Sequence, residues 1–454
     1  MSNVHVYDYN LYYQTIRSDG NITAEVVSSP SSTRVFLVVL LRIGFTLVHV
    51  GSVPVNNVNL ILLQNIIDFA WVTFVYLVIG SIIAYTGDTR GVIGGGYWIG
   101  EDIVDKDEVL VGWAAVVIAA AICTCGIVGR THTVGYLIIG FLLAGLVQPF
   151  MIHWIWTGKG WMRMNELNDE KVHFHDFAGS TVIHLVGGLS GLIGCMILGR
   201  RILRLDSIDE ASIAIGSSGT VYAGQLMVFM GLQAAYMPCY QEKKRLHYSV
   251  YVNNLLAASA CSLLVVLYHF LLPKEEFNHW TVMRCVQAMV AGLVMISAGA
   301  DIYSPAVATC LGASASILFY LTSRQIFRSA LEDYCNMIAI HLVCSILGSL
   351  LVPLFVIHDN NDASIILMNF LWHLICLAAI ICSVSLIMFT AFAILQCTGL
   401  LRNRSEHLNH LRATIAEGRA SRRKTFLERL FRLDNNSTFI QPGTSTNEPS
   451  GRRF

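Results

Sequence analysis

Two histidines in matching apolar segments are the side chains of this chain best suited to chemistry. His184 follows Asp176 by eight residues, and His341 follows Asp333 by eight residues. Both histidines belong to an Ile-His-Leu-Val run, and an aromatic residue follows each aspartate. Ionisable groups within apolar segments are costly and mark pathways for polar solutes. The matched pair therefore predicts a functional site.

Helical geometry predicts where the two imidazoles lie. Eight residues of helix rise about 12 Å, so each histidine should lie roughly 12 Å below the membrane face near its aspartate. The two segments are the fifth and tenth apolar spans of the chain, so they cross a membrane in opposite directions. Their depths should differ by only about 6 Å in a hydrocarbon core of roughly 30 Å. Two neutral imidazoles at that depth can share a hydrogen bond, one nitrogen donating to the other.

A dry apolar passage beside two neutral imidazoles discriminates strongly between solutes. A bare ion loses its hydration there, at a cost that the imidazoles cannot repay. Ammonium can release a proton and cross as ammonia, whereas sodium and potassium have no neutral form. The pair therefore favours deprotonation of ammonium and passage of ammonia, with or without a relayed proton. The spacing alone does not establish this substrate.

Long apolar spans must position these histidines. The chain has 454 residues, of which 54% are hydrophobic and 13% charged, and its mean hydropathy is +0.58. Soluble domains carry roughly 25% charged residues, so the composition excludes a soluble fold. About 18 apolar residues cross a hydrocarbon core. Eleven runs approach or exceed this length: 35–51, 58–85, 109–129, 133–154, 177–199, 212–236, 250–272, 281–302, 304–323, 334–357 and 364–396.

The spans predict an all-α polytopic membrane protein of eleven transmembrane helices. Spans 1–5 and 6–10 form an inverted repeat, with one extra helix after them. Only Ser304 and Pro305 divide the stretch 281–323, so those two spans could be one. Such repeats place a substrate path at the midplane between the halves. Small residues three and seven positions after each histidine allow close helix packing: Gly187, Gly191, Cys344 and Gly348.

Basic residues predict the orientation of the chain in the membrane. Residues 401–454 hold eleven Lys and Arg against five Asp and Glu, whereas the segment 86–108 is acidic. The tail is therefore predicted to be cytoplasmic and the N-terminus extracellular, although Lys243, Lys244 and Arg245 break the rule. The expected organisation is an extracellular segment over 1–33, a transmembrane domain over 34–400 and a basic cytoplasmic tail over 401–454. Its composition predicts disorder after about residue 435.

Four further residues are candidates for particular roles. Arg42 and Asp68 lie within the first two spans, about 13–15 Å from the cytoplasmic ends. They are predicted to form an ion pair, because neither charge is tolerable alone there. The alternative is that each faces a wet cavity or a subunit interface. Asn21 belongs to a glycosylation sequon, and Thr425 follows three basic residues as a candidate phosphorylation site.

The remaining composition argues against several other classes of protein. The twelve cysteines are scattered singly in apolar runs, apart from Cys123 and Cys125, so they are interpreted as small hydrophobic residues. We expect no metal and no cofactor. The formal net charge of zero argues against a nucleic-acid partner. No nucleotide motif or nucleophile arrangement is recognisable in the sequence, so an enzyme is not expected.

The segment from His175 to Arg201 resembles the fifth-span signature of the ammonium transporter (Amt/Mep/Rhesus) family, in its ammonium-transporter branch. The segments His153–Trp156 and Ala291–Pro305 also match that family. The resemblance covers roughly residues 34–400. It implies ammonium transport across the plasma membrane by a homotrimer with one pore per subunit.

The resemblance also implies roles for single residues. His184 and His341 would be the paired pore histidines, Asp176 the acid that supports the ammonium site, and Trp156 an aromatic wall of the outer vestibule. The acid Asp333 occupies the matching position of the second repeat.

Three positions depart from the family pattern. Alignment places the two outer-gate phenylalanines of the family at Ala115 and Ala235, and its ammonium-binding serine at Cys239. Trp113 and Tyr236 are nearby aromatic residues that could substitute. Two alternatives to a transporter therefore remain. One is a low-flux ammonium-sensing receptor or subunit on the same fold, and the other is a channel for another small neutral solute.

Overall fold

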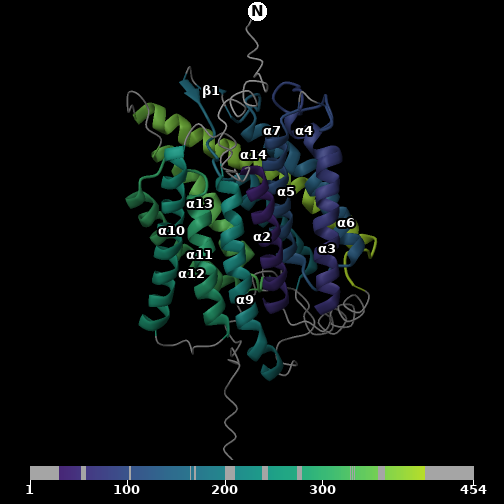
Figure 1. Cartoon of the computed structure of the whole chain (residues 1–454), viewed down its shortest axis with the longest axis vertical. Helices are drawn as coiled ribbons and strands as arrows, with labels where there is room; N and C mark the ends of the chain where they lie inside the picture. The colour runs from purple at the N-terminus through teal and green to yellow at the C-terminus, as the bar shows by residue number, and fades with distance from the viewer. Residues whose placement is uncertain are drawn as a thin grey trace, which may run out of the picture.

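The computed structural model is a bundle of helices that run mostly along the long axis of the molecule (Figure 1). It describes residues 30–52, 58–101, 104–163, 165–167, 170–199, 210–237, 244–272, 279–327, 329, 331, 333–355 and 363–403. Three residues singled out in the sequence lie outside this part of the chain: Asn21, Cys239 and Thr425. The proposed disordered end of the tail lies outside it as well.

Each span expected in the first half of the chain corresponds to one helix or to one stack of consecutive helices. These are α2 (Pro30–Ser52); α3 (Val58–Val75) with η1 (Tyr76–Gly80) and α4 (Ser81–Tyr85); α5 (Lys106–Ile127); α6 (Thr133–Leu142) with η2 (Leu143–Val147) and α7 (Gln148–Trp156); and η3 (Ser180–Leu185) with α8 (Val186–Leu198). A short antiparallel hairpin, β1 (Asn165–Leu167) and β2 (Glu170–Val172), follows α7 and was not expected from the sequence.

The second half repeats this order. It comprises α9 (Glu210–Leu232) with η5 (Gln233–Tyr236); α10 (Lys244–Leu271); α11 (His279–Ile296); α12 (Pro305–Phe327); and η7 (Ile338–Val343) with α13 (Cys344–Leu351) and η8 (Val352–Leu354). The eleventh span is α14 (Ala363–Cys397). The stretch 281–323 is divided into α11 and α12 by a turn, so the interpretation as a single span is wrong. Within the described residues, eight helices are long and apolar enough to cross a membrane, and two further apolar helices are shorter.

The first helices of the two halves cross each other at a pair of glycines. A Cβ atom added to Gly44 in α2 would lie 2.6 Å from the carbonyl oxygen of Gly224 in α9. A Cβ atom added to Gly224 would in turn lie 2.7 Å from the carbonyl oxygen of Gly44. Small residues at such crossings let helix backbones approach closely. The equivalent first helices of the repeat are therefore packed backbone against backbone.

We expect Gly44→Ala to destabilise the protein by about 1–3 kcal/mol, since the new methyl group meets backbone atoms that cannot rotate away. The measurement is the thermal unfolding midpoint of the purified protein in detergent. Gly219→Ala is the matched control, because Gly219 lies in α9 with nothing within 4 Å of its added Cβ. An unchanged midpoint for Gly44→Ala would contradict the close crossing.

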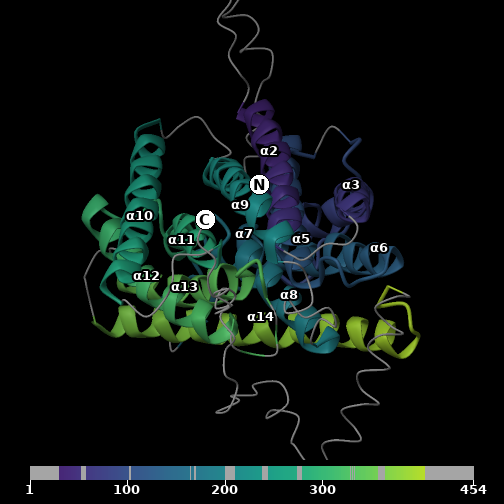
Figure 2. The same cartoon turned by 90° about the horizontal axis from the view of Figure 1, so that it is seen from below.

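The last helix joins the two halves. Helix α14 has 35 residues, and a helix of that length extends about 52 Å. This exceeds a hydrocarbon core of roughly 30 Å, and Figure 1 shows α14 running obliquely across the other helices. Figure 2 shows α14 running along one side of the bundle, and it contacts α6 and α8 as well as α13.

Hydrogen bonds fix α14 to both halves. Asn369 Oδ1 accepts from the backbone N–H of His173 at 3.0 Å. His373 Nε2 accepts from the backbone N–H of His175 at 3.2 Å, and its Nδ1 donates to the carbonyl oxygen of Ser349 at 2.9 Å. One face of α14 is therefore bonded to the loop before η3 and to the end of α13.

Candidate functional site

The structure brings His184 and His341 together in the middle of the bundle. Their Nδ1 atoms are 3.1 Å apart, and their ring centroids are 5.0 Å apart with the ring planes inclined by 19°. His184 is fully buried and His341 is 3% exposed. One Nδ1 must donate and the other accept, so the two rings cannot both carry a proton on that atom. The arrangement is a buried, hydrogen-bonded imidazole pair.

Each histidine lies in a six-residue π-helical segment, His184 in η3 and His341 in η7. The sequence predicts regular helix for both segments, and here the structure differs. The residue five positions before each histidine has a left-handed backbone, with φ +81° at Gly179 and φ +54° at Asn336. Glycine and asparagine tolerate this conformation best. The repeat therefore extends to the irregular backbone that presents the two rings, and π-helical turns are frequent at functional sites.

The two aspartates of the repeat hold the starts of these helical segments. Asp176 Oδ2 accepts from the backbone N–H groups of Thr181 at 3.0 Å and Val182 at 2.9 Å. Asp333 Oδ2 accepts from the N–H of Ile338 at 2.7 Å. The first N–H groups of a helix have no partner within it, so a carboxylate stabilises them. The aspartates thereby set the orientation of the segments that carry the histidines.

The second carboxylate oxygen of Asp176 is buried and has no hydrogen-bond partner among the described residues. The Trp156 indole N–H donates to the backbone carbonyl of Asp176 at 2.7 Å. Trp156 itself is only partly buried. The Trp156 ring is therefore tied to the backbone of Asp176, whose carboxylate lies at the start of η3. A carboxylate oxygen and an aromatic face are both groups that attract a small cation.

The turn between α11 and α12, in the second half of the chain, packs against the segment just before η3. The N–H groups of Phe177 and Ala178 donate to the carbonyls of Ala298 and Ser297, each at 2.9 Å. His175 Nε2 lies 2.9 Å from an oxygen of Asp301. The sequence analysis did not single out this His–Asp pair, because its partners are 126 residues apart. Their only signal was that both belong to the segments that resemble the family.

A second His–Asp contact joins α7 to the loop after α4. His153 Nε2 lies 3.1 Å from Asp88 Oδ1, and His153 Nδ1 lies 2.8 Å from the carbonyl oxygen of Ala84. The hydrogen bond with His153 lowers the pKa of the Asp88 carboxyl. Asp88 is therefore held as a carboxylate at the end of the bundle where Trp156 lies.

The positions at which the family pattern expects gate phenylalanines carry small side chains. Ala115 is fully buried in α5, and Ala235 is partly buried in η5. The segment η5 contacts α5, so the two positions belong to neighbouring elements. No aromatic ring can extend from either residue into a passage.

The two aromatic residues nearest these positions are bonded elsewhere. The Trp113 indole N–H donates to Thr73 Oγ1 at 3.0 Å, and the Tyr236 hydroxyl donates to the carbonyl of Leu293 at 2.8 Å. Both rings are buried. The structure therefore gives each ring a fixed position, and no contact of either ring with Trp156 is present in the described part of the chain.

Arg42 and Asp68, the pair expected from the sequence, lie next to each other between α2 and α3. Arg42 Nη2 is 2.8 Å from Asp68 Oδ2, and both side chains are buried. Arg42 Nη2 also donates to the carbonyl oxygen of Asn65 at 3.1 Å. The ion pair thus joins the first two spans.

The chain is similar to known proteins both in sequence and in fold. A model of the Ammonium Transporter Family matches residues 33–412. Ammonium transporter 1 member 3 of Solanum lycopersicum is 27% identical over 410 residues, covering 82% of this chain and 87% of that protein. A solved structure titled Sensor Amt Protein has a TM-score of 0.70 at 19% identity, covering 82% of this chain and 94% of that one. Mep2 of Saccharomyces cerevisiae has a TM-score of 0.67 at 18% identity, covering 82% and 86%.

Proposed function

This chain therefore belongs to the ammonium transporter family, and we propose that it moves ammonium nitrogen across a membrane past the His184–His341 pair. The observation that carries the proposal is the 3.1 Å contact between the two buried Nδ1 atoms. Two rings that share one hydrogen bond are polar at their edges without being charged. Such a pair favours a small neutral solute with N–H donors and a lone pair over a bare ion.

The proposed path begins beside Trp156 and Asp176. An arriving ammonium ion contacts the partly exposed Trp156 ring. The buried Asp176 carboxylate, whose backbone carbonyl is bonded to that ring, attracts the positive charge from behind the surface. It then releases a proton, and ammonia continues past the imidazole pair with or without that proton following through the rings. Sodium and potassium have no proton to release, so the same path should exclude them.

The proposed setting is the plasma membrane, with the N-terminus extracellular and the C-terminus cytoplasmic. The distribution of basic residues supports this orientation. The start of the tail also supports it, because the tail lies against the loop that contains Arg130. The carbonyl oxygen of Leu401 accepts from the N–H of His132, and the N–H of Asn403 donates to the carbonyl oxygen of Arg130. This basic loop and the tail therefore lie on the same side of the bundle. Large exposed apolar side chains, such as Phe36 and Phe270, suit contact with lipid or with neighbouring subunits.

The assembly and the domain limits belong to the same proposal. In this proposal the protein forms a homotrimer with one pathway per subunit, and the transmembrane domain of each subunit covers residues 34–400. Asn21 then lies on the glycosylated side, and Thr425 lies in the cytoplasmic tail. The match of the family to most of the chain supports this organisation.

A receptor with low flux is the second candidate, favoured by the small side chains at Ala115 and Ala235. Without aromatic gate residues, cation–π contact at the entrance is limited to Trp156. Such a protein would hold ammonium at Asp176 and pass little of it. Only transport measurements separate this candidate from the first.

The deciding experiment is a transport assay on the purified protein in liposomes. An imposed ammonium gradient should change the internal pH faster than in protein-free liposomes, or produce a current that those liposomes lack, with no response to sodium or potassium gradients. Ammonium binding without flux would favour the receptor. Passage of an uncharged solute with ammonium excluded would favour the neutral-solute channel.

We expect Asp176→Asn to raise the half-saturating ammonium concentration about tenfold, because it removes a charge-assisted contact worth roughly 1.5–3 kcal/mol. The amide oxygen can still accept from the N–H groups of Thr181 and Val182, so the start of η3 is retained. Asp333→Asn is the matched control: it makes the same change in the second repeat and should leave external affinity unchanged. Equal effects of the two substitutions would mean that Asp176 acts only on the helix.

A further inference from the structure

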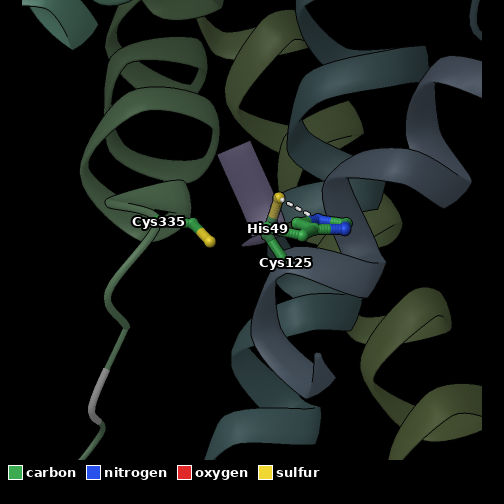
Figure 3. A group of neighbouring side chains, drawn as sticks. All are labelled: His49, Cys125 and Cys335. Carbon is green, nitrogen blue, oxygen red and sulfur yellow. Dashed lines mark hydrogen bonds between the residues drawn. The ribbon is translucent and has the colours of Figure 1, made fainter. Parts of the chain in front are cut away.

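Three side chains from distant parts of the chain meet one aromatic ring away from the histidine pair. Figure 3 shows His49 from α2, Cys125 from α5 and Cys335 from the turn before η7, with the Cys335 sulfur pointing toward the other two. The imidazole Nε2 of His49 lies 3.2 Å from Cys125 Sγ. One ligand atom from each residue lies within 4.8 Å of the other two, and all three residues are buried. The sequence analysis treated these cysteines as packing residues.

We propose that His49, Cys125 and Cys335 form a binding site for one Zn²⁺ ion. Thiolate and imidazole are the ligands that Zn²⁺ prefers. Tetrahedral Zn–S bonds of about 2.3 Å and Zn–N bonds of about 2.0 Å separate ligand atoms by roughly 3.5–3.8 Å. The present separations reach that range with shifts of about 1 Å. Three protein ligands leave a fourth position for water or another small ligand.

The charge balance favours a divalent metal. On binding, each of the two thiols releases one proton to solvent, so the two thiolates and Zn²⁺ sum to zero. A neutral complex is tolerable in this buried apolar region, whereas Cu⁺ with the same ligands would leave one negative charge. Burial of all three side chains therefore favours a divalent ion over a monovalent one.

Cys335 is held in place by hydrogen bonds to its own backbone and to the residue that follows it. Gln287 Nε2 donates to the backbone carbonyl of Cys335 at 3.0 Å. Asn336, the next residue, donates through Nδ2 to Gln287 Oε1 at 2.5 Å. Partners that orient a ligand without touching the metal are typical of metal sites. The turn that begins η7 thus presents Cys335 in a fixed position.

The cluster lies one aromatic ring from the imidazole pair. The ring of Phe45 is 6.3 Å from the ring of His49 and 6.2 Å from the ring of His341, centroid to centroid. His49 follows Phe45 by one helical turn toward the end of α2 that the proposed topology makes cytoplasmic. If the proposed transport occurs, a metal bound here lies beside the exit of the pathway. Bound Zn²⁺ should then reduce the flux, an effect that rests on the proposed function.

The site is tested by metal binding, without transport. The probe is Co²⁺, which replaces Zn²⁺ in tetrahedral sites and absorbs through thiolate-to-metal charge transfer. The full-length protein, purified in detergent with a non-thiol reductant, should bind one equivalent and show a two-thiolate band that Zn²⁺ removes. Absence of this band in the wild-type protein overturns the proposal, and that result does not depend on any variant folding.

Variants then assign the ligands. Cys125→Ala and Cys335→Ala should each weaken Zn²⁺ binding at least about 100-fold, more than the loss of an orienting partner. Cys123→Ala is the matched control, since Cys123 is buried in the same helix, two positions from Cys125. It should bind as the wild-type protein does. Equal Zn²⁺ affinity of Cys125→Ala and Cys123→Ala would overturn the assignment.

Flux measurements separate this proposal from the proposed function. Zn²⁺ should inhibit ammonium flux through the wild-type protein and not through Cys125→Ala. Zn²⁺ binding without ammonium flux in any form would keep the site and overturn the transport function. Ammonium flux with no Zn²⁺ binding would do the reverse.

Discussion

His184→Ala is expected to lower ammonium flux in proteoliposomes by about 10- to 100-fold. The substitution removes one of the two polar ring edges that ammonia would contact in the apolar passage, and a polar solute left there without a hydrogen bond costs roughly 1–3 kcal/mol. Each 1.4 kcal/mol added to a barrier slows a step about tenfold. His341→Ala should produce the same loss, because the two rings share a single hydrogen bond. The measurement is the initial rate of internal pH change after an ammonium jump.

The double variant makes this prediction sharper. Residues in one network show non-additive effects, so His184→Ala combined with His341→Ala should lose little more flux than either single change. His269→Ala is the control, because His269 lies in α10, against Tyr320 and away from the pair. Flux that survives both single substitutions would exclude the pair from the pathway.

Reversal of either charge in the Arg42–Asp68 pair is expected to destabilise the protein by about 3–5 kcal/mol, the cost of leaving a buried charge without its partner. Arg42→Asp places two carboxylates together, and Asp68→Arg places two guanidinium groups together. The thermal unfolding midpoint in detergent should fall sharply for each single variant. The loss arises because water cannot reach either side chain.

Combining Arg42→Asp with Asp68→Arg should restore most of the lost stability. The pair then has its charges exchanged between α2 and α3, and the opposite signs again lie next to each other. Arg42→Lys serves as the control that retains the charge and removes the forked geometry, so it should cost less than reversal. No recovery in the double variant would mean that each charge is stabilised by other groups.

Hydropathy predicted the helical framework because a membrane span requires a long apolar run. The divided stretch 281–323 shows where this signal is weak. Ser304 and Pro305 predicted a break there, whereas the structure places the connection over residues 297–304, between Ile296 at the end of α11 and Pro305 at the start of α12. The His–Asp repeat was recognisable because the same eight-residue spacing occurs in the fifth and tenth spans. These spans run in opposite directions, so the equal spacing places the two rings at similar depth.

The π-helical turns could not be predicted from periodicity, since apolar residues surround both histidines and give no phase. One signal was available: Gly179 and Asn336, both tolerant of a left-handed backbone, occupy the same position before each histidine. The proposed metal ligands lacked even such a signal. His49 and Cys125 are 76 residues apart, and zinc patterns are recognised in sequences by short spacings. Only the packing of α2 against α5 brings them together.

Helix α14 also restricts how the protein can work. Many transporters expose a central site first to one side and then to the other by rocking one half of an inverted repeat against its mate. Here a single long helix is hydrogen-bonded to the loop before η3 and to the end of α13, so a rocking motion would have to break those bonds in every cycle. These bonds therefore oppose rocking of the two halves, and they favour opening by the turning of individual side chains.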